Sequence, residues 1–283
     1  MTSRLFIIAL FAVTTLSARH RCVTFNEALK TGLISAKALS AGGYQGYCMK
    51  LQVSNKTPDS LDVQIDAGTL FNSVDNKYQD ILMVKEEHLK LKRYETNQLK
   101  IKGYCCQSGN YSPFPNCKYD FAKKADSNLV RLAQFLSAHK LEPGAEQNAV
   151  WAISNNHPTA SILSKDDLAQ YELRKLVAAM KHEKTPWYLL NTSHCVDRNG
   201  RVRYYSERLS GTLSYTLDKD EYVTLTVYDA SHRPVCLIRK GWALKGINRQ
   251  YDLDLPVKNL TPGQYTVELC CDHATLATQS ISL

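Results

Sequence analysis

Two blocks of alternating apolar and polar residues constrain the fold of this chain more than any other feature. The runs of the first block cover residues 48–53, 61–65, 79–84 and 99–104, and turn-forming residues separate them, as at 55–59. Successive side chains of a strand point to opposite faces, so such runs favour half-buried antiparallel strands. We therefore predict an N-terminal β-sandwich or barrel.

The second block has the same period and lies in the C-terminal third of the chain. Its runs cover residues 202–205, 211–217, 222–228, 235–238, 250–255 and 265–270. Short strands at this spacing, separated by turns such as Pro262-Gly263, are typical of an Ig-like β-sandwich. We place this domain at 201–283 and expect a linker at 186–200.

Helical patterns separate the two blocks. A helix is predicted within 119–140, a second from near Ala145 after Pro143-Gly144, and a third up to about residue 181. Residues 25–39 favour one short helix near the N-terminus, with Asn26 as its cap. The predicted fold class is mainly β with a helical segment, in which a domain at 19–185 precedes the Ig-like sandwich.

The N-terminus has the pattern of a signal peptide. Arg4 precedes an apolar run at 5–13 and small residues up to Ala18, so we expect cleavage after residue 18. That run is too short for a permanent membrane helix, and we expect no stable membrane span elsewhere. The mature chain is therefore predicted to be secreted, periplasmic or on the cell surface.

The charge of the chain is basic but dispersed. There are 35 Lys and Arg residues against 27 Asp and Glu, and 85–93 is the only dense basic stretch. We interpret this as a solvated basic surface, with affinity for anionic glycans or cell surfaces as the alternative. A nucleic-acid partner is not expected for an exported chain. The expected partner is an extracellular or cell-surface protein or glycan.

The cysteines and histidines suggest no metal centre or cofactor. Nine cysteines leave at least one unpaired if the others form disulfides, and the alternative is that several are reduced and buried. The chain has no Cys-x-x-Cys, and its eight histidines show no ligand spacing with cysteines or carboxylates. We therefore predict no metal site and no cofactor.

One pair of short motifs suggests covalent chemistry. Tyr104-Cys105 and the later run Gln147-x-Ala149-Val150-Trp151 resemble the thioester domains of bacterial surface adhesins, whose signature is an aromatic-Cys dipeptide followed by Thr-Gln-x-Ala-aliphatic-Trp. The resemblance implies that the Cys and Gln side chains form an internal thioester, which bonds to a nucleophile on a partner surface. Glu146 replaces the Thr of that signature.

A second Tyr-Cys dipeptide leaves the choice of cysteine open. Tyr47-Cys48 lies nearer the usual separation from the glutamine in that family, but Cys105 is preferred because its strand is expected to lead directly into the helical segment. Tyr104 would donate a hydrogen bond to the sulfur or pack beside it. Trp151, one turn after Gln147, would shield the bond from water.

The C-terminal block carries a second resemblance. Residues 222–229 and 260–267 are similar to the Ig-like domains of flagellar-hook capping proteins and to type IX secretion sorting domains. Such domains are stalks or export tags rather than catalysts. The chain ends without the basic tail that those sorting domains usually carry.

The sequence supports two hypotheses. The first is a secreted or cell-surface adhesin-like protein with a Cys-Gln thioester; the second is a non-covalent extracellular structural or binding module with disulfides, in which Cys105 pairs with Cys117 or Cys48. His194-Cys195 offers a base and a nucleophile, but sequence neighbours seldom face each other and no third, orienting group is evident. We therefore do not predict an enzyme.

Overall fold

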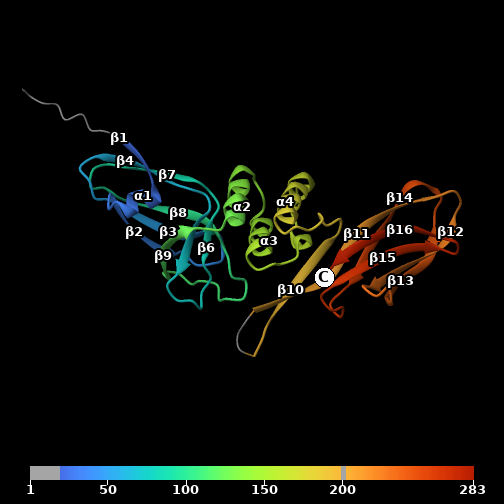
Figure 1. Cartoon of the computed structure of the whole chain (residues 1–283). Coiled ribbons are helices and arrows are strands. Elements are labelled where there is room, and N and C mark those ends of the chain that lie inside the picture. Colours follow the sequence, from blue (N-terminus) through green and yellow to red (C-terminus); the bar gives the residue numbers. More distant parts are fainter. Residues whose placement is uncertain (1–19, 199–201) are drawn as a thin grey trace, which may run out of the picture.

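A computed structural model describes residues 20–198 and 202–283; the predicted signal peptide at 1–18 lies outside the described residues. The chain is mainly β, as the sequence predicts, with a barrel near the N-terminus, helices in the middle and further sheets toward the C-terminus. These three parts follow one another along an elongated molecule (Figure 1).

A closed antiparallel barrel forms the N-terminal part. Its strand order is β2 (Ile34–Ser40), β3 (Gln45–Asn55), β8 (Thr96–Cys105), β6 (Ile81–Met83), β5 (Thr69–Ser73) and β9 (Lys118–Lys124). A small sheet of β1 (His20–Thr24), β4 (Ser60–Ile65) and β7 (Glu87–Leu91) shares its apolar core.

The single helix expected at 25–39 is wrong. Helix α1 covers only Phe25–Lys30, and its N-cap is Thr24, whose hydroxyl accepts from the Glu27 N–H. Gly32 follows at φ +71°, a left-handed conformation that ends the helix at little steric cost. The chain then continues as strand β2, in which Ile34 and Ala38 are buried in the barrel core.

The first half of the helix expected at 119–140 is a strand instead. β9 pairs with β2 and β5 and thereby closes the barrel. Helix α2 (Ser127–Ala138) begins only after Asp126, whose carboxylate accepts from the N–H groups of Asn128 and Leu129. The helices therefore do not follow β8 directly, and the sequence-based reason for preferring Cys105 was incorrect.

Three α-helices and a short 3-10 turn cover one side of the barrel. They are α2, α3 (Pro143–Ser154) and α4 (Asp167–Met180), with the turn at Thr159–Ser161. Pro143 is the first residue of α3, slightly before the predicted start near Ala145, and its missing N–H has no cost at this position. The buried faces of these helices share an apolar core with Leu82, Tyr104 and Cys106 of the barrel wall.

Two sheets with a common apolar core form the C-terminal part. One contains β10 (Leu189–Val196), β11 (Val202–Leu217) and β14 (Gly246–Pro256). The other contains β13 (Pro234–Ala243), β12 (Glu221–Asp229), β15 (Gln264–Cys271) and β16 (Ala274–Ser282). Leu209 and Leu213 of the first sheet and Val227 and Val267 of the second belong to this core.

This part differs from the prediction in three ways. The expected linker at 186–200 contains β10, which pairs with β11 along its whole length. The two strands predicted at 202–205 and 211–217 are one continuous strand, and β16 was not predicted. β10 and β11 extend beyond the other C-terminal strands toward the helices and the barrel (Figure 1).

Arg174 joins the helices to the C-terminal sheets. Its buried guanidinium donates to the carbonyl oxygens of Ile162, Ala160 and Tyr188, at 2.8, 2.8 and 3.1 Å. Tyr188 belongs to the core of the C-terminal sheets. The helix α4 thus anchors the chain at the point where it enters β10.

Among the residues described, no helix combines the length and the apolar character that crossing a membrane requires.

All nine cysteines lie within the described ranges, and each is a free thiol in this structure. The disulfides considered for Cys105 with Cys117 or Cys48 are therefore not formed here, although all three residues share the barrel core.

Candidate functional site

The carboxamide of Gln147 is bonded to the backbone of Cys105. Its Oε1 accepts from the Cys105 N–H at 3.2 Å, and its Nε2 donates to the Cys105 carbonyl oxygen at 2.9 Å. Cys105 is fully buried and Gln147 is 1% exposed. Two residues that lie far apart in the sequence are therefore in direct contact, out of reach of bulk water.

Local structure explains how each residue reaches this position. Cys105 ends β8, where its N–H is shared between Gln147 and the Tyr44 carbonyl oxygen at 3.0 Å. Gln147 lies in the first turns of α3, which begins at Pro143 and packs against β8. The glutamine amide thus bonds to the end of β8 as a residue of a neighbouring strand would.

The thiol of Cys105 and the carboxamide of Gln147 lie in different directions from the Cys105 backbone. The Cys105 side chain belongs to the core inside the barrel, whereas Tyr104 and Cys106 belong to the core beneath the helices. Backbone N–H and C=O groups lie in the plane of a sheet, and Cβ projects out of that plane. The carboxamide therefore contacts the backbone of Cys105, while the Cys105 thiol belongs to the barrel core.

Cys48, the alternative cysteine, has a different partner. Its thiol donates to the Gly103 carbonyl oxygen at 3.4 Å, and burial raises its pKa to about 12. It lies in the same core as Cys105. The hydrogen bonds of Gln147 described above go to the backbone of Cys105, whereas the Cys48 thiol is bonded to Gly103. The preference for Cys105 over Cys48 stays a prediction.

Both thiols are protonated at neutral pH. Burial, and secondarily the neighbouring Cys48, raise the pKa of Cys105 far above its ordinary value. Any attack on the amide carbon must therefore start from the neutral thiol and not from a stable thiolate. This differs from exposed catalytic cysteines, whose pKa is lowered by nearby positive charge.

Tyr104 was expected beside the Cys105 sulfur, but it faces away from it. Its side chain faces the helices, where burial, and then the adjacent Glu146 carboxylate, raise its pKa. Glu146 is fully buried and pairs with Lys102, whose Nζ lies 2.8 and 2.7 Å from the two carboxylate oxygens. The residue that departs from the family signature therefore joins α3 to β8, one position before Gln147.

Trp151 belongs to a group of aromatic rings, which we call the aromatic cover. Its indole stacks on Tyr44, with ring centroids 6.0 Å apart, and lies 5.6 Å from His157 and 5.3 Å from Tyr204. Tyr44 provides the carbonyl that bonds Cys105, and Trp151 is one turn from Gln147. The aromatic cover is thus linked to the Cys105–Gln147 contact through Tyr44 and through α3. The shielding role expected of Trp151 stays a prediction.

Three members of the aromatic cover were missed by sequence reasoning. Tyr44 precedes β3, His157 follows α3, and Tyr204 lies on β11 in the C-terminal part. No local pattern connects these positions, because tertiary contacts alone bring them together. Burial, followed by Tyr44 and Cys105, raises the pKa of Tyr204, which agrees with its position near the contact.

His157 forms a second polar contact at the edge of the aromatic cover. Its Nε2 lies 2.9 Å from the Ser108 hydroxyl, and the Ser108 N–H donates to the Asn155 side chain at 2.9 Å. Burial, and then the charge of Lys181, lower the pKa of His157 to about 4. The imidazole is therefore neutral and bonded at physiological pH.

His194 and Cys195, considered as a base and a nucleophile, do not form such a pair. They are consecutive exposed residues of β10, so their side chains project from opposite faces of the strand. The His194 ring lies 5.8 Å from Tyr204, at the rim of the aromatic cover.

No family model matches the chain, and no curated protein matches it. The resemblance to thioester domains therefore depends on the motif residues and on the geometry of this contact.

Proposed function

We propose that this chain is a secreted or cell-surface adhesin-like protein that attaches covalently to a partner through an internal thioester between Cys105 and Gln147. The single observation that carries the proposal is the pair of hydrogen bonds that hold the Gln147 carboxamide against Cys105 in a buried niche. Fixed proximity of this kind is what a slow reaction between a thiol and an amide requires.

The bond-forming step needs no external reagent. The Cys105 Sγ bonds to the Gln147 amide carbon, the bond from that carbon to Nε2 breaks, and the thiol proton leaves with the amide nitrogen as ammonia. The Cys105 N–H at 3.2 Å from Oε1 would stabilise the negative charge that develops on this oxygen. A protonated thiol is thus a suitable starting state, since its proton is consumed by the leaving group.

Attachment reverses the role of the sulfur. An amine or hydroxyl of the partner would bond to the amide carbon of Gln147, the carbon–sulfur bond would break, and the proton of the nucleophile would return to Cys105. The product is an amide or ester link to Gln147. We propose an extracellular or cell-surface protein or glycan as the partner, because such surfaces present both nucleophiles.

Burial supports the survival of such a bond before the partner arrives. Trp151, one turn after Gln147 on α3, is 7% exposed and packs against Tyr44 and Tyr204. We expect these rings to exclude water from the contact. Excluding water slows hydrolysis of a reactive acyl group. Tyr44 is 41% exposed, so a nucleophile would enter past this ring.

Intact mass spectrometry of the purified full chain tests the proposal. We expect a mass lower by one ammonia than the free-thiol sequence requires, and incorporation of methylamine at Gln147 on treatment with that amine. Cys105→Ala should abolish both, whereas Cys48→Ala, a buried cysteine of the same core, should preserve both. An unchanged wild-type mass together with no methylamine incorporation would contradict the proposal.

A non-covalent structural or binding module is the second candidate. The observation in its favour is that the oxygen and the nitrogen of the Gln147 carboxamide each form a hydrogen bond with the Cys105 backbone, as in a structural bridge from α3 to β8. In that case Gln147→Leu would lower the stability by about 1 to 3 kcal/mol, because the buried Cys105 carbonyl oxygen loses the Gln147 donor, whereas the Cys105 N–H keeps the Tyr44 carbonyl oxygen. The wild-type mass would match the unmodified sequence.

A further inference from the structure

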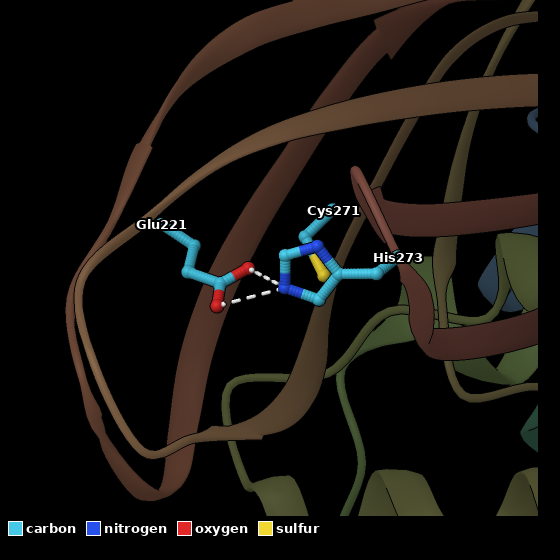
Figure 2. A group of neighbouring side chains, drawn as sticks. All are labelled: Glu221, Cys271 and His273. Carbon is cyan, nitrogen blue, oxygen red and sulfur yellow. Dashed lines mark hydrogen bonds and ion pairs between the residues drawn. The ribbon is translucent and has the colours of Figure 1, made fainter.

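A cluster of three possible metal ligands lies at one end of the C-terminal sheets, far along the chain from Cys105. It consists of the Glu221 carboxylate, the Cys271 sulfur and the His273 imidazole, with one ligand atom of each within 4.8 Å of the others. Figure 2 shows Glu221 and His273 pointing toward each other, with the Cys271 sulfur beside the imidazole ring.

Strand pairing brings these residues together. Val223 of β12 lies opposite Cys271 of β15, so Glu221, two residues earlier, faces the position of His273. His273 lies in the two-residue turn that joins β15 to β16, where Cys271 pairs with Ala274. A two-residue hairpin loop is a rigid connection, which fixes Cys271 and His273 relative to each other.

The distances are compatible with a tetrahedral ion. The His273 Nε2 lies 3.2 and 3.1 Å from the two oxygens of Glu221. Zinc bonds of roughly 2.0 to 2.3 Å place neighbouring ligand atoms about 3.3 to 3.8 Å apart. The Cys271 sulfur lies within 4.8 Å of the other two ligand atoms, so we expect side-chain rotations to bring all three around one ion. The His273 side chain is 64% exposed.

The charges also favour a cation at this position. The Glu221 side chain is only 12% exposed at the end of an apolar core, and burying a carboxylate is costly without a positive partner. Lys219 is the nearby cation, with its Nζ 3.5 Å from Glu221, but its side chain is 73% exposed. An ion bound by all three ligands would compensate the carboxylate more closely than this exposed lysine.

We propose that Glu221, Cys271 and His273 bind a zinc ion. A thiolate, an imidazole and a carboxylate are the ligand types that zinc prefers, and the thiolate and carboxylate together balance its charge. Binding releases the Cys271 proton, and the solvent side of the cluster leaves a fourth position for water. This departs from the expectation of no metal site, which considered sequence spacing and not the pairing of β12 with β15.

Metal content and affinity of the purified full chain test the proposal. After removal of metal and addition of excess Zn²⁺, we expect one tightly bound ion per chain, and Co²⁺ in its place should give the absorption of a thiolate-ligated ion. Cys271→Ser, His273→Gln and Glu221→Gln should each weaken zinc binding by at least about 100-fold. Cys270→Ser is the matched control and should retain full affinity.

Three results would overturn the zinc site: no bound ion in the wild-type chain, unchanged affinity in Cys271→Ser, or an equal loss in Cys270→Ser. Circular dichroism of each variant identifies a folding defect. If Cys271→Ser does not fold, the zinc affinity of His273→Gln tests the site instead, because that substitution lies in an exposed turn. Zinc should also raise the melting temperature of the wild-type chain but not that of His273→Gln.

Discussion

Lys102 of β8 and Glu146 of α3 form an ion pair, with the lysine Nζ 2.8 and 2.7 Å from the two carboxylate oxygens, directly beside the Cys105–Gln147 contact. Each partner lies within three residues of the candidate pair in sequence. The ion pair therefore fixes the position of α3 on β8, and with it the position of Gln147.

The loss of stability on breaking this ion pair should depend on which partner is replaced. Lys102→Met leaves the fully buried Glu146 carboxylate without its cation, which should lower the free energy of unfolding by about 3 to 5 kcal/mol. Glu146→Gln leaves a lysine whose side chain is 23% exposed and can reach water, so we expect a loss of about 1 to 2 kcal/mol. Urea denaturation measures both, with the exposed Lys100→Met as control. Equal losses for the two variants would contradict this account.

Tyr204 should control how long the proposed thioester survives. Tyr204→Ala removes a ring 5.3 Å from Trp151 and admits water to the niche. We expect hydrolysis of the ammonia-deficient form to accelerate about tenfold, a change of about 1.4 kcal/mol in activation free energy. Time-resolved intact mass spectrometry follows the reaction.

The matched control for that variant is Tyr205→Ala. Tyr205 projects from the opposite face of β11, and its ring contacts Lys258 rather than the aromatic cover. A similar acceleration in both variants would mean that general loosening of the strand, and not the loss of the cover, exposes the bond.

His157 should make stability depend on pH. Its pKa in the fold is about 4, below the ordinary value of 6.5, so the unfolded chain binds the proton first as the pH falls. The contribution of the neutral imidazole is complete above about pH 6.5 and is lost as the pH falls toward 4. Allowing for partial exposure, the loss is of the order of 2 kcal/mol.

Denaturation at pH 7 and pH 4 isolates this contribution when wild type is compared with His157→Gln, which keeps a hydrogen-bonding group near Ser108. The wild-type chain should lose more stability than the variant over this interval. The same loss in both chains would assign the effect to other titrating groups.

Gly103 is required by the packing of β8 against β6. A Cβ at this position would lie 2.5 Å from the Ile81 side chain and 3.0 Å from the Leu82 carbonyl oxygen. Gly103→Ala should therefore lower the free energy of unfolding by about 1 to 3 kcal/mol. Gly144→Ala, in the first turn of α3 with no atom within 4 Å of the new Cβ, should leave stability unchanged or raise it slightly. Thermal denaturation of both variants provides the comparison.

The sequence by itself determined the features that local physics controls. Period-two runs identified strands on both sides of a helical segment, because a strand with one buried face must alternate. The residue pair Cys105 and Gln147 was identifiable from its motif, and the start of α3 near Ala145 placed the glutamine in the first turns of a helix. The strand and helix assignments depend on residues that are neighbours in sequence, whereas the pairing of Cys105 with Gln147 was expected from the motif resemblance.

Only the tertiary structure decided which distant residues meet. β9 closes the barrel by pairing with β2 and β5. These partners lie far away in the sequence, so the apolar pattern of 119–140 does not reveal the pairing. Hydrogen bonds across 42 residues distinguish Cys105 from Cys48, and the register of β12 with β15 brings Glu221 to Cys271 and His273. The physical reason is the same in each case: strand register and helix docking depend on contacts between residues far apart in the sequence. The periodicity of one segment does not identify the residues that it contacts in another.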